Sequence, residues 1–166
     1  NGMLSKVWHD RYEMEMSCRE DIVGIKNSID IIDGVIDEMV TSEGIPCSNI
    51  FVWGLSMGGH MALQAVSLSR HSADLAGVVG LSCFLSTSSH MWDDAATEKR
   101  KSTRIPPIKM IHGEADSLIP FQWGATTAAM LADRYGADVQ FSTISGLFHD
   151  LCEPEIEDVI NWIISK

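Results

Sequence analysis

A serine framed by two glycines is the strongest chemical signal in the sequence. Gly54, Ser56 and Gly58 match the pattern Gly-x-Ser-x-Gly, which lets a nucleophilic serine sit on a sharp turn between a strand and a helix. An apolar segment, residues 49–53, precedes it, and an amphipathic segment follows. A helix that begins after Ser56 would offer the Met57 backbone N–H to a developing oxyanion. We therefore expect Ser56 to be a nucleophile; the alternative is a tight turn with an incidental serine.

A serine hydroxyl needs a general base at neutral pH, and the sequence holds six histidines. His149 lies in a loop after the last expected strand, at the sheet edge where α/β proteins build their sites. His112 ends a strand and could reach the same edge, but a strand-terminal histidine is more often structural. His60 falls on the helix after Ser56, where a single histidine is usually solvated or packed. We expect His149 to be the base; an ordinary helix-flanking histidine is the alternative.

An acid that could orient the histidine lies between the serine and the histidine in the chain. Asp116 follows a strand in the segment His112-Gly113-Glu114-Ala115-Asp116. Its carboxylate could accept a hydrogen bond from one imidazole nitrogen and leave the other nitrogen free for Ser56. The order serine, aspartate, histidine is that of the α/β hydrolases. Two alternatives stay open: Asp116 as a cap of the following helix, and Glu114 as the acid.

Strands and helices alternate along the segments that must position these residues. The apolar patterns predict strands over residues 49–53, 75–82, 107–112 and 138–144, and helices over residues 19–43, 57–70, 120–135 and 154–165. The first strand is apolar without alternation, as in a parallel strand covered on both faces. The spacing of Ser17 and Glu20 predicts a capping box for the first helix. The alternation predicts a single three-layer α/β domain over residues 1–166 with a mostly parallel sheet.

Charge and composition exclude several partners. The sequence has 12 Lys and Arg against 23 Asp and Glu, a formal charge of −11, so binding to nucleic acid through bulk positive charge is disfavoured. No apolar run approaches the roughly 18 residues that cross a bilayer. The four cysteines, Cys18, Cys47, Cys83 and Cys152, lack metal-ligand spacing and fit reduced thiols in a cytoplasmic protein. We expect no metal and no cofactor. The polar residues 86–104 predict a surface excursion or lid.

Several motifs together resemble the acyl-protein thioesterase and lysophospholipase-like (carboxylesterase) family of the α/β hydrolases. They are Gly44-Ile45-Pro46, Gly54-Leu55-Ser56-Met57-Gly58-Gly59, Leu75-Ala76-Gly77-Val78, His112-Gly113-x-x-Asp116 and the loop from Gly146 to His149. Val7-Trp8-x-Asp10-Arg11 is most similar to the lysophospholipase-like branch. The resemblance implies an ester or thioester hydrolase with Ser56, Asp116 and His149 as its triad. It also implies an acyl groove lined by Trp8, Leu55 and Leu118, and an acylated protein or a lysolipid as substrate.

The sequence departs from that family at its start. The family begins with strands and a His-Gly loop that donates one oxyanion-hole N–H, and no matching segment is present in the sequence. The Met57 N–H is then the only donor assigned by a motif. Strand 50–53 would become a sheet edge and favour self-association, and Trp53 replaces a small residue next to the elbow. The rival functions are a catalytically weak relic that acts as a binding domain and a peptidase-like hydrolase.

Overall fold

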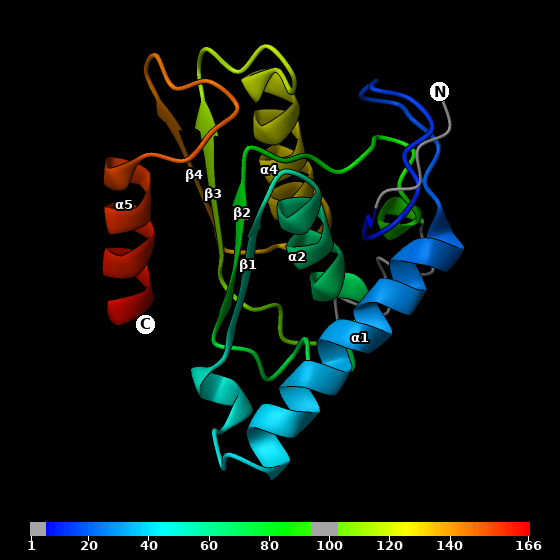
Figure 1. Cartoon of the computed structure of the whole chain (residues 1–166), viewed down its shortest axis with the longest axis vertical. Coiled ribbons are helices and arrows are strands. Elements are labelled where there is room, and N and C mark those ends of the chain that lie inside the picture. Colours follow the sequence, from blue (N-terminus) through cyan, green and yellow to red (C-terminus); the bar gives the residue numbers. More distant parts are fainter. Residues whose placement is uncertain (1–5, 94–102) are drawn as a thin grey trace.

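Four parallel strands form the sheet at the centre of the molecule (Figure 1). They are β1 (Phe51–Leu55), β2 (Gly77–Leu81), β3 (Ile108–Gly113) and β4 (Val139–Ile144), in the order β1-β2-β3-β4. Each neighbouring pair is parallel, so all four carboxyl ends lie at one edge of the sheet, at the top in Figure 1. The computed structural model describes residues 6–93 and 103–166.

Helices cover both faces of this sheet, which confirms the predicted three-layer α/β fold (Figure 1). They are α1 (Ile22–Thr41), α2 (Met57–Leu68), α4 (Phe121–Tyr135) and α5 (Glu153–Ile164), with short 3-10 helices at Cys47–Asn49 and His90–Trp92. Helix α5 covers one face, α2 and α4 cover the other, and α1 packs on the outside of α2. No helix among the described residues is long and apolar enough to span a membrane. Residues 94–102 of the expected surface excursion or lid lie outside the described residues, whereas Ser86, Ser89, Met91 and Trp92 in its described part are buried, so that part is not a surface excursion.

The two central strands are buried on both faces, whereas β1, whose apolar run without alternation predicted such burial, is only partly buried because it lies at the side of the sheet. Every residue of β2 and β3 is buried. Val78 and Met110 face a core that includes Leu63 of α2 and Leu131 of α4. On the other face, Val79, Leu81 and Ile111 pack with Val159 and Trp162 of α5. The carboxyl ends of the strands, where the candidate site lies, are therefore supported by apolar cores on both faces of the sheet.

The start of helix α1 differs from the sequence prediction. Helix α1 begins at Ile22 because Asp21 is its N-cap and accepts a hydrogen bond from the Gly24 N–H at 3.0 Å. The predicted capping box of Ser17 and Glu20 is therefore wrong. Helices α1 and α5 also expose apolar side chains, which are Ile22, Val23, Ile31 and Val35 in α1 and Ile160 and Ile164 in α5.

Strand β1 lies at the edge of the sheet and, within the described part of the chain, pairs only with β2. A groove of about 280 Å³ lies between β1 and α1. Its lining is apolar and includes Trp8, Val35, Met39, Val52 and Trp53. Trp53 is 51% exposed. An unpaired apolar edge thus borders the strand that leads into Ser56.

Candidate active site

Ser56 occupies a strained turn between β1 and α2. Its φ of 55° and ψ of −119° lie in a region that non-glycine residues rarely adopt. A Cβ at Gly54 would lie 2.4 Å from the Gly58 carbonyl carbon, so the turn closes only with glycine there. The Ser56 N–H donates to the Leu81 carbonyl at 2.8 Å, which ties the turn to the sheet. This is the elbow that the Gly-x-Ser-x-Gly pattern predicts.

The loop after β3 surrounds the Asp116 carboxylate with donors. Asp116 is 6% exposed. Its Oδ1 accepts hydrogen bonds from the N–H groups of Leu118 at 2.9 Å and Ile119 at 2.8 Å, which leaves Oδ2 for the histidine. Burial raises the pKa of Asp116, but the hydrogen bonds from Ile119 and His149 more than offset it, so the pKa lies below its ordinary value. The carboxylate is therefore ionised at neutral pH.

His149 meets this carboxylate from the loop after β4. His149 Nδ1 lies 2.7 Å from Asp116 Oδ2, and the imidazole is 20% exposed. Because an ionised carboxylate only accepts, Nδ1 carries the hydrogen and Nε2 is left with a lone pair. No hydrogen bond joins the Ser56 hydroxyl to His149 among the described residues, and such contacts often tighten only when substrate binds. All three predicted residues stand at the carboxyl edge of the sheet.

Backbone contacts hold the two loops together. The Ala115 N–H donates to the Leu147 carbonyl and the Glu114 N–H to the Ile144 carbonyl, both at 3.0 Å. A Cβ at Gly113 would lie 2.2 Å from the Leu147 carbonyl oxygen. Only glycine therefore lets the two loops approach this closely.

The geometry separates the alternatives that the sequence leaves open for the acid. Glu114 is exposed and its Oε1 accepts a hydrogen bond from Thr143 Oγ1 at 2.7 Å, and no hydrogen bond joins it to His149 among the described residues. Asp116 does not cap α4, whose N-cap is Pro120 without a side-chain hydrogen bond. Of the two carboxylates, Asp116 is the one that contacts the imidazole.

The residues expected around the substrate lie in different surroundings. Met57 is the first residue of α2, directly after Ser56. Trp8 is 43% exposed, and its Nε1 lies 4.0 Å from the position of a Cβ on Gly58. Leu118 is 53% exposed beside Asp116. Leu55 is instead partly buried and packs against the core beneath α5. It therefore supports the strand that leads to Ser56 and does not line an open groove.

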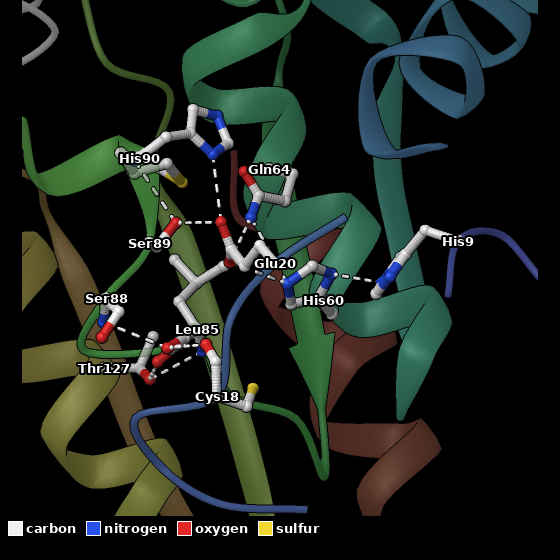
Figure 2. Close-up of polar contacts among 12 residues, drawn as sticks. His9, Cys18, Glu20, His60, Gln64, Leu85, Ser88, Ser89, His90 and Thr127 are labelled. Atoms are coloured by element: carbon white, nitrogen blue, oxygen red, sulfur yellow. Dashed lines mark hydrogen bonds and ion pairs between the residues drawn. The ribbon is translucent and has the colours of Figure 1, made fainter. Parts of the chain in front are cut away.

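A buried polar cluster fixes the segment that carries Trp8 to helix α2 (Figure 2). Its centre is Glu20, whose carboxylate contacts Gln64 Nε2 at 2.9 Å, Ser89 Oγ at 2.8 Å, His90 Nδ1 at 3.0 Å and His60 Nε2 at 3.3 Å. Burial raises the pKa of Glu20, but hydrogen bonds from His60 and His90 reverse this and lower it. Sequence reasoning missed this cluster, since its members are far apart in the chain.

Two buried titratable groups lie near the elbow and near the histidine loop. His60 is 3% exposed, and burial lowers its pKa to about 4. On its other side, His60 Nδ1 lies 3.1 Å from His9 Nε2. Glu155, in the first turn of α5, is fully buried, and burial raises its pKa to about 7. Both groups are therefore more readily neutral in the folded chain than in the unfolded chain.

Among the described residues, no group of three or more His, Cys, Asp or Glu side chains could hold a metal ion.

We predict that His60 and Glu155 contribute opposite slopes to stability against pH. Between pH 4 and 6.5 the unfolded chain binds a proton on His60 that the folded chain does not, so its contribution rises with pH. Glu155 binds a proton in the folded chain up to about pH 7, so its contribution falls with pH. Each unit of pKa shift corresponds to about 1.4 kcal/mol.

Urea denaturation between about pH 5 and 6.5 separates the two contributions. We expect the free energy of unfolding of His60→Gln to fall with pH relative to the parent chain, and that of Glu155→Gln to rise. Parallel curves for the parent chain and both variants would contradict the assignment.

We predict that Gly113→Ala lowers the free energy of unfolding by about 1–3 kcal/mol, because its Cβ overlaps the Leu147 carbonyl. Gly34→Ala is the matched control, since a Cβ on that helical glycine meets no heavy atom within 4 Å. The control should gain about 0.5–1 kcal/mol from helix propensity. Equal stabilities in urea would show that the loops do not need the close approach.

Comparison with known proteins agrees with this architecture. A family model described as phospholipase/carboxylesterase matches residues 1–165. Lysophospholipase-like protein 1 of Mus musculus is 35% identical over 165 residues, which are 99% of this chain and 66% of that protein. Acyl-protein thioesterase 1 of Debaryomyces hansenii is 29% identical over 163 residues, 98% of this chain and 68% of that protein. The chain thus spans about two thirds of the length of these relatives.

Solved structures share the fold at lower identity. The crystal structure of Arabidopsis thaliana SOBER1 superposes with a TM-score of 0.82 at 23% identity, over 99% of this chain and 75% of that chain. The Zea mays acyl-protein thioesterase 2 structure gives a TM-score of 0.78 at 20% identity, over 96% and 71% of the two chains. With a family model that matches nearly every residue, the chain belongs to the phospholipase/carboxylesterase family of α/β hydrolases.

Proposed function

We propose that the protein is a serine hydrolase that cleaves carboxylic esters or thioesters through an acyl-enzyme on Ser56. The observation that carries the proposal is the 2.7 Å contact between His149 Nδ1 and Asp116 Oδ2, at the same sheet edge as the strained Ser56. A buried ionised carboxylate on one imidazole nitrogen is what a general base requires. The names of the relatives, a lysophospholipase-like protein and an acyl-protein thioesterase, agree with this chemistry.

In this mechanism His149 Nε2 takes the proton of the Ser56 hydroxyl as the oxygen attacks the acyl carbonyl. The carbonyl oxygen becomes an oxyanion, and the Met57 N–H at the start of α2 donates to it. His149 then returns the proton to the leaving alcohol or thiol, and the acyl group stays on Ser56. Water, activated by the same imidazole, releases the acid and restores the serine. Asp116 stays ionised and stabilises the imidazolium that forms.

The exposed apolar side chains around the site favour an acyl chain as part of the substrate. Trp8, Leu118 and Phe148 are 43%, 53% and 66% exposed, respectively. Phe148 directly precedes His149, and Leu118 lies two residues beyond Asp116. An acylated protein or a lysolipid would supply such a chain. We also propose a reducing, cytoplasmic environment, on the scattered spacing of the four cysteines in the sequence.

The test of the nucleophile is covalent labelling by a fluorophosphonate probe. We expect the chain to be labelled on Ser56, Ser56→Ala to lose the label, and His149→Ala to react far more slowly because the base is absent. Ser42→Ala is the control, since Ser42 is an exposed serine at the C-terminal end of α1 and is not part of the elbow. A label that persists in Ser56→Ala would remove Ser56 from its role. Labelling without any hydrolysis of a short-chain ester would favour the binding-domain alternative.

We also propose that the 166-residue chain self-associates through β1. The edge residues Phe51, Val52 and Trp53 carry neither charge nor proline, the features that normally block pairing of an exposed strand. Light scattering should give a mass that rises with concentration, and Trp53→Lys should reduce it. Ile164→Lys, at a 77% exposed position in α5, is the control and should leave it unchanged. A monomer at every concentration would refute the pairing.

A further inference from the structure

His112 lies beneath the predicted acid and has no part in the mechanism above. It is the fifth residue of β3 and is 1% exposed. Its Nε2 lies 2.9 Å from the Ile119 carbonyl oxygen and 3.3 Å from Asp116 Oδ2. When Asp116 is ionised, the Ile119 carbonyl oxygen and Asp116 Oδ2 can act only as hydrogen-bond acceptors. His112 Nε2 must therefore carry the hydrogen. His112 therefore donates to the loop that holds the carboxylate and faces the carboxylate itself.

The hydrogen bonds of Ile119 show what this donor does to the loop. The Ile119 N–H donates to Asp116 Oδ1 at 2.8 Å, while its carbonyl accepts from His112 Nε2 at 2.9 Å. Ile119 is thus held from both sides, and it in turn holds one oxygen of Asp116. Without the His112 donor, the Ile119 carbonyl would be a buried acceptor without this partner, which is costly. The loop would then shift, and with it the carboxylate that faces His149.

The charge state of His112 also suits a positioning role. Burial lowers its pKa, although the Ile119 carbonyl and Asp116 act in the opposite direction. A neutral imidazole donates a hydrogen bond to the loop without cancelling the carboxylate charge. The negative charge of Asp116 then remains available to His149, whose imidazole is the other titratable group on Oδ2.

Helix α4 holds the opposite edge of the same ring. A Cβ at Gly124 would lie 2.5 Å from His112 Nδ1 and 3.3 Å from the Cys83 carbonyl oxygen. The absence of a side chain at Gly124 therefore makes room for the imidazole, which sits between α4 and the Asp116 loop. A ring held from both edges has one orientation, with Nε2 toward Ile119 and Asp116.

We propose that His112 is a positioning residue that keeps Asp116 Oδ2 on His149 Nδ1 by anchoring the loop through its Nε2–H. The proposal rests on the proposed function for its kinetic consequence, and on geometry alone for its structural consequence.

The experiment compares His112→Gln, whose amide can place a donor near the former Nε2, with His112→Leu, which has no donor. The substrate is p-nitrophenyl acetate. For His112→Leu we expect kcat to fall about 10- to 100-fold, the size of effect that small misplacements of catalytic groups produce, with KM nearly unchanged. His112→Gln should recover most of kcat. Proton NMR should show a downfield His149 Nδ1–H resonance in the parent chain and His112→Gln that is lost in His112→Leu.

A second variant leaves His112 in place and displaces it. Gly124→Ala should push the imidazole toward the loop and weaken the same resonance, whereas Gly34→Ala in α1, where a Cβ meets open space, should not. This pair keeps the proposal testable if His112→Leu fails to fold.

The outcomes separate the two proposals. A folded His112→Leu chain, or Gly124→Ala chain, that keeps both kcat and the resonance would overturn the role of His112. Equal loss in His112→Gln and His112→Leu would overturn the donor role in particular. A parent chain that neither hydrolyses the ester nor reacts with a fluorophosphonate would refute the proposed function. The NMR comparison needs no turnover and would still decide whether His112 anchors Asp116.

Discussion

The 2.7 Å hydrogen bond between His149 Nδ1 and Asp116 Oδ2 requires two loops, 33 residues apart at these positions, to meet at one edge of the sheet. Parallel pairing of β3 with β4 brings both loops to that edge, and Gly113 lets their backbones touch. The buried Asp116 is ionised because Leu118, Ile119 and His149 all donate to it. The contact between Asp116 and His149 in the proposed site therefore requires that the backbone first bring the loops after β3 and β4 together.

A second constraint of the same kind acts at the serine. Ser56 and Ser82 are the two non-glycine residues with positive φ among residues 6–93 and 103–166, and both follow a strand at the carboxyl edge. The turn at Ser56 can form because Gly54 and Gly59 have no side chain. A Cβ on these residues would lie 2.4 Å and 2.7 Å, respectively, from the nearest backbone atom. The buried sheet, apolar on both faces, stabilises both strained residues.

Local patterns predicted the parts of this molecule that depend on local physics. The strand, glycine and helix spacing around Ser56 predicted the elbow, and the alternation of apolar segments predicted the three layers. The sequence could not reveal the buried cluster of Glu20, whose members are far apart in the chain. It also could not reveal the contact of His112 with Asp116, because that contact depends on how the loop after β3 folds and not on the motif alone. The spacing of Ser17 and Glu20 predicted a helix cap, whereas the Glu20 carboxylate contacts His60, which lies 40 residues further along the chain. The exposed apolar residues of α1 and α5, such as Ile22 and Ile160, show that the apolar face of a helix can be wider than the surface it packs against.

The most direct measurement is a crystal structure of the chain after reaction with a methylphosphonate ester probe. The account predicts phosphorus bonded to Ser56 Oγ, a phosphonyl oxygen facing the Met57 N–H, and His149 Nδ1 still about 2.7 Å from Asp116 Oδ2. An adduct on another residue, or an imidazole turned away from Asp116 with the serine modified, would contradict it.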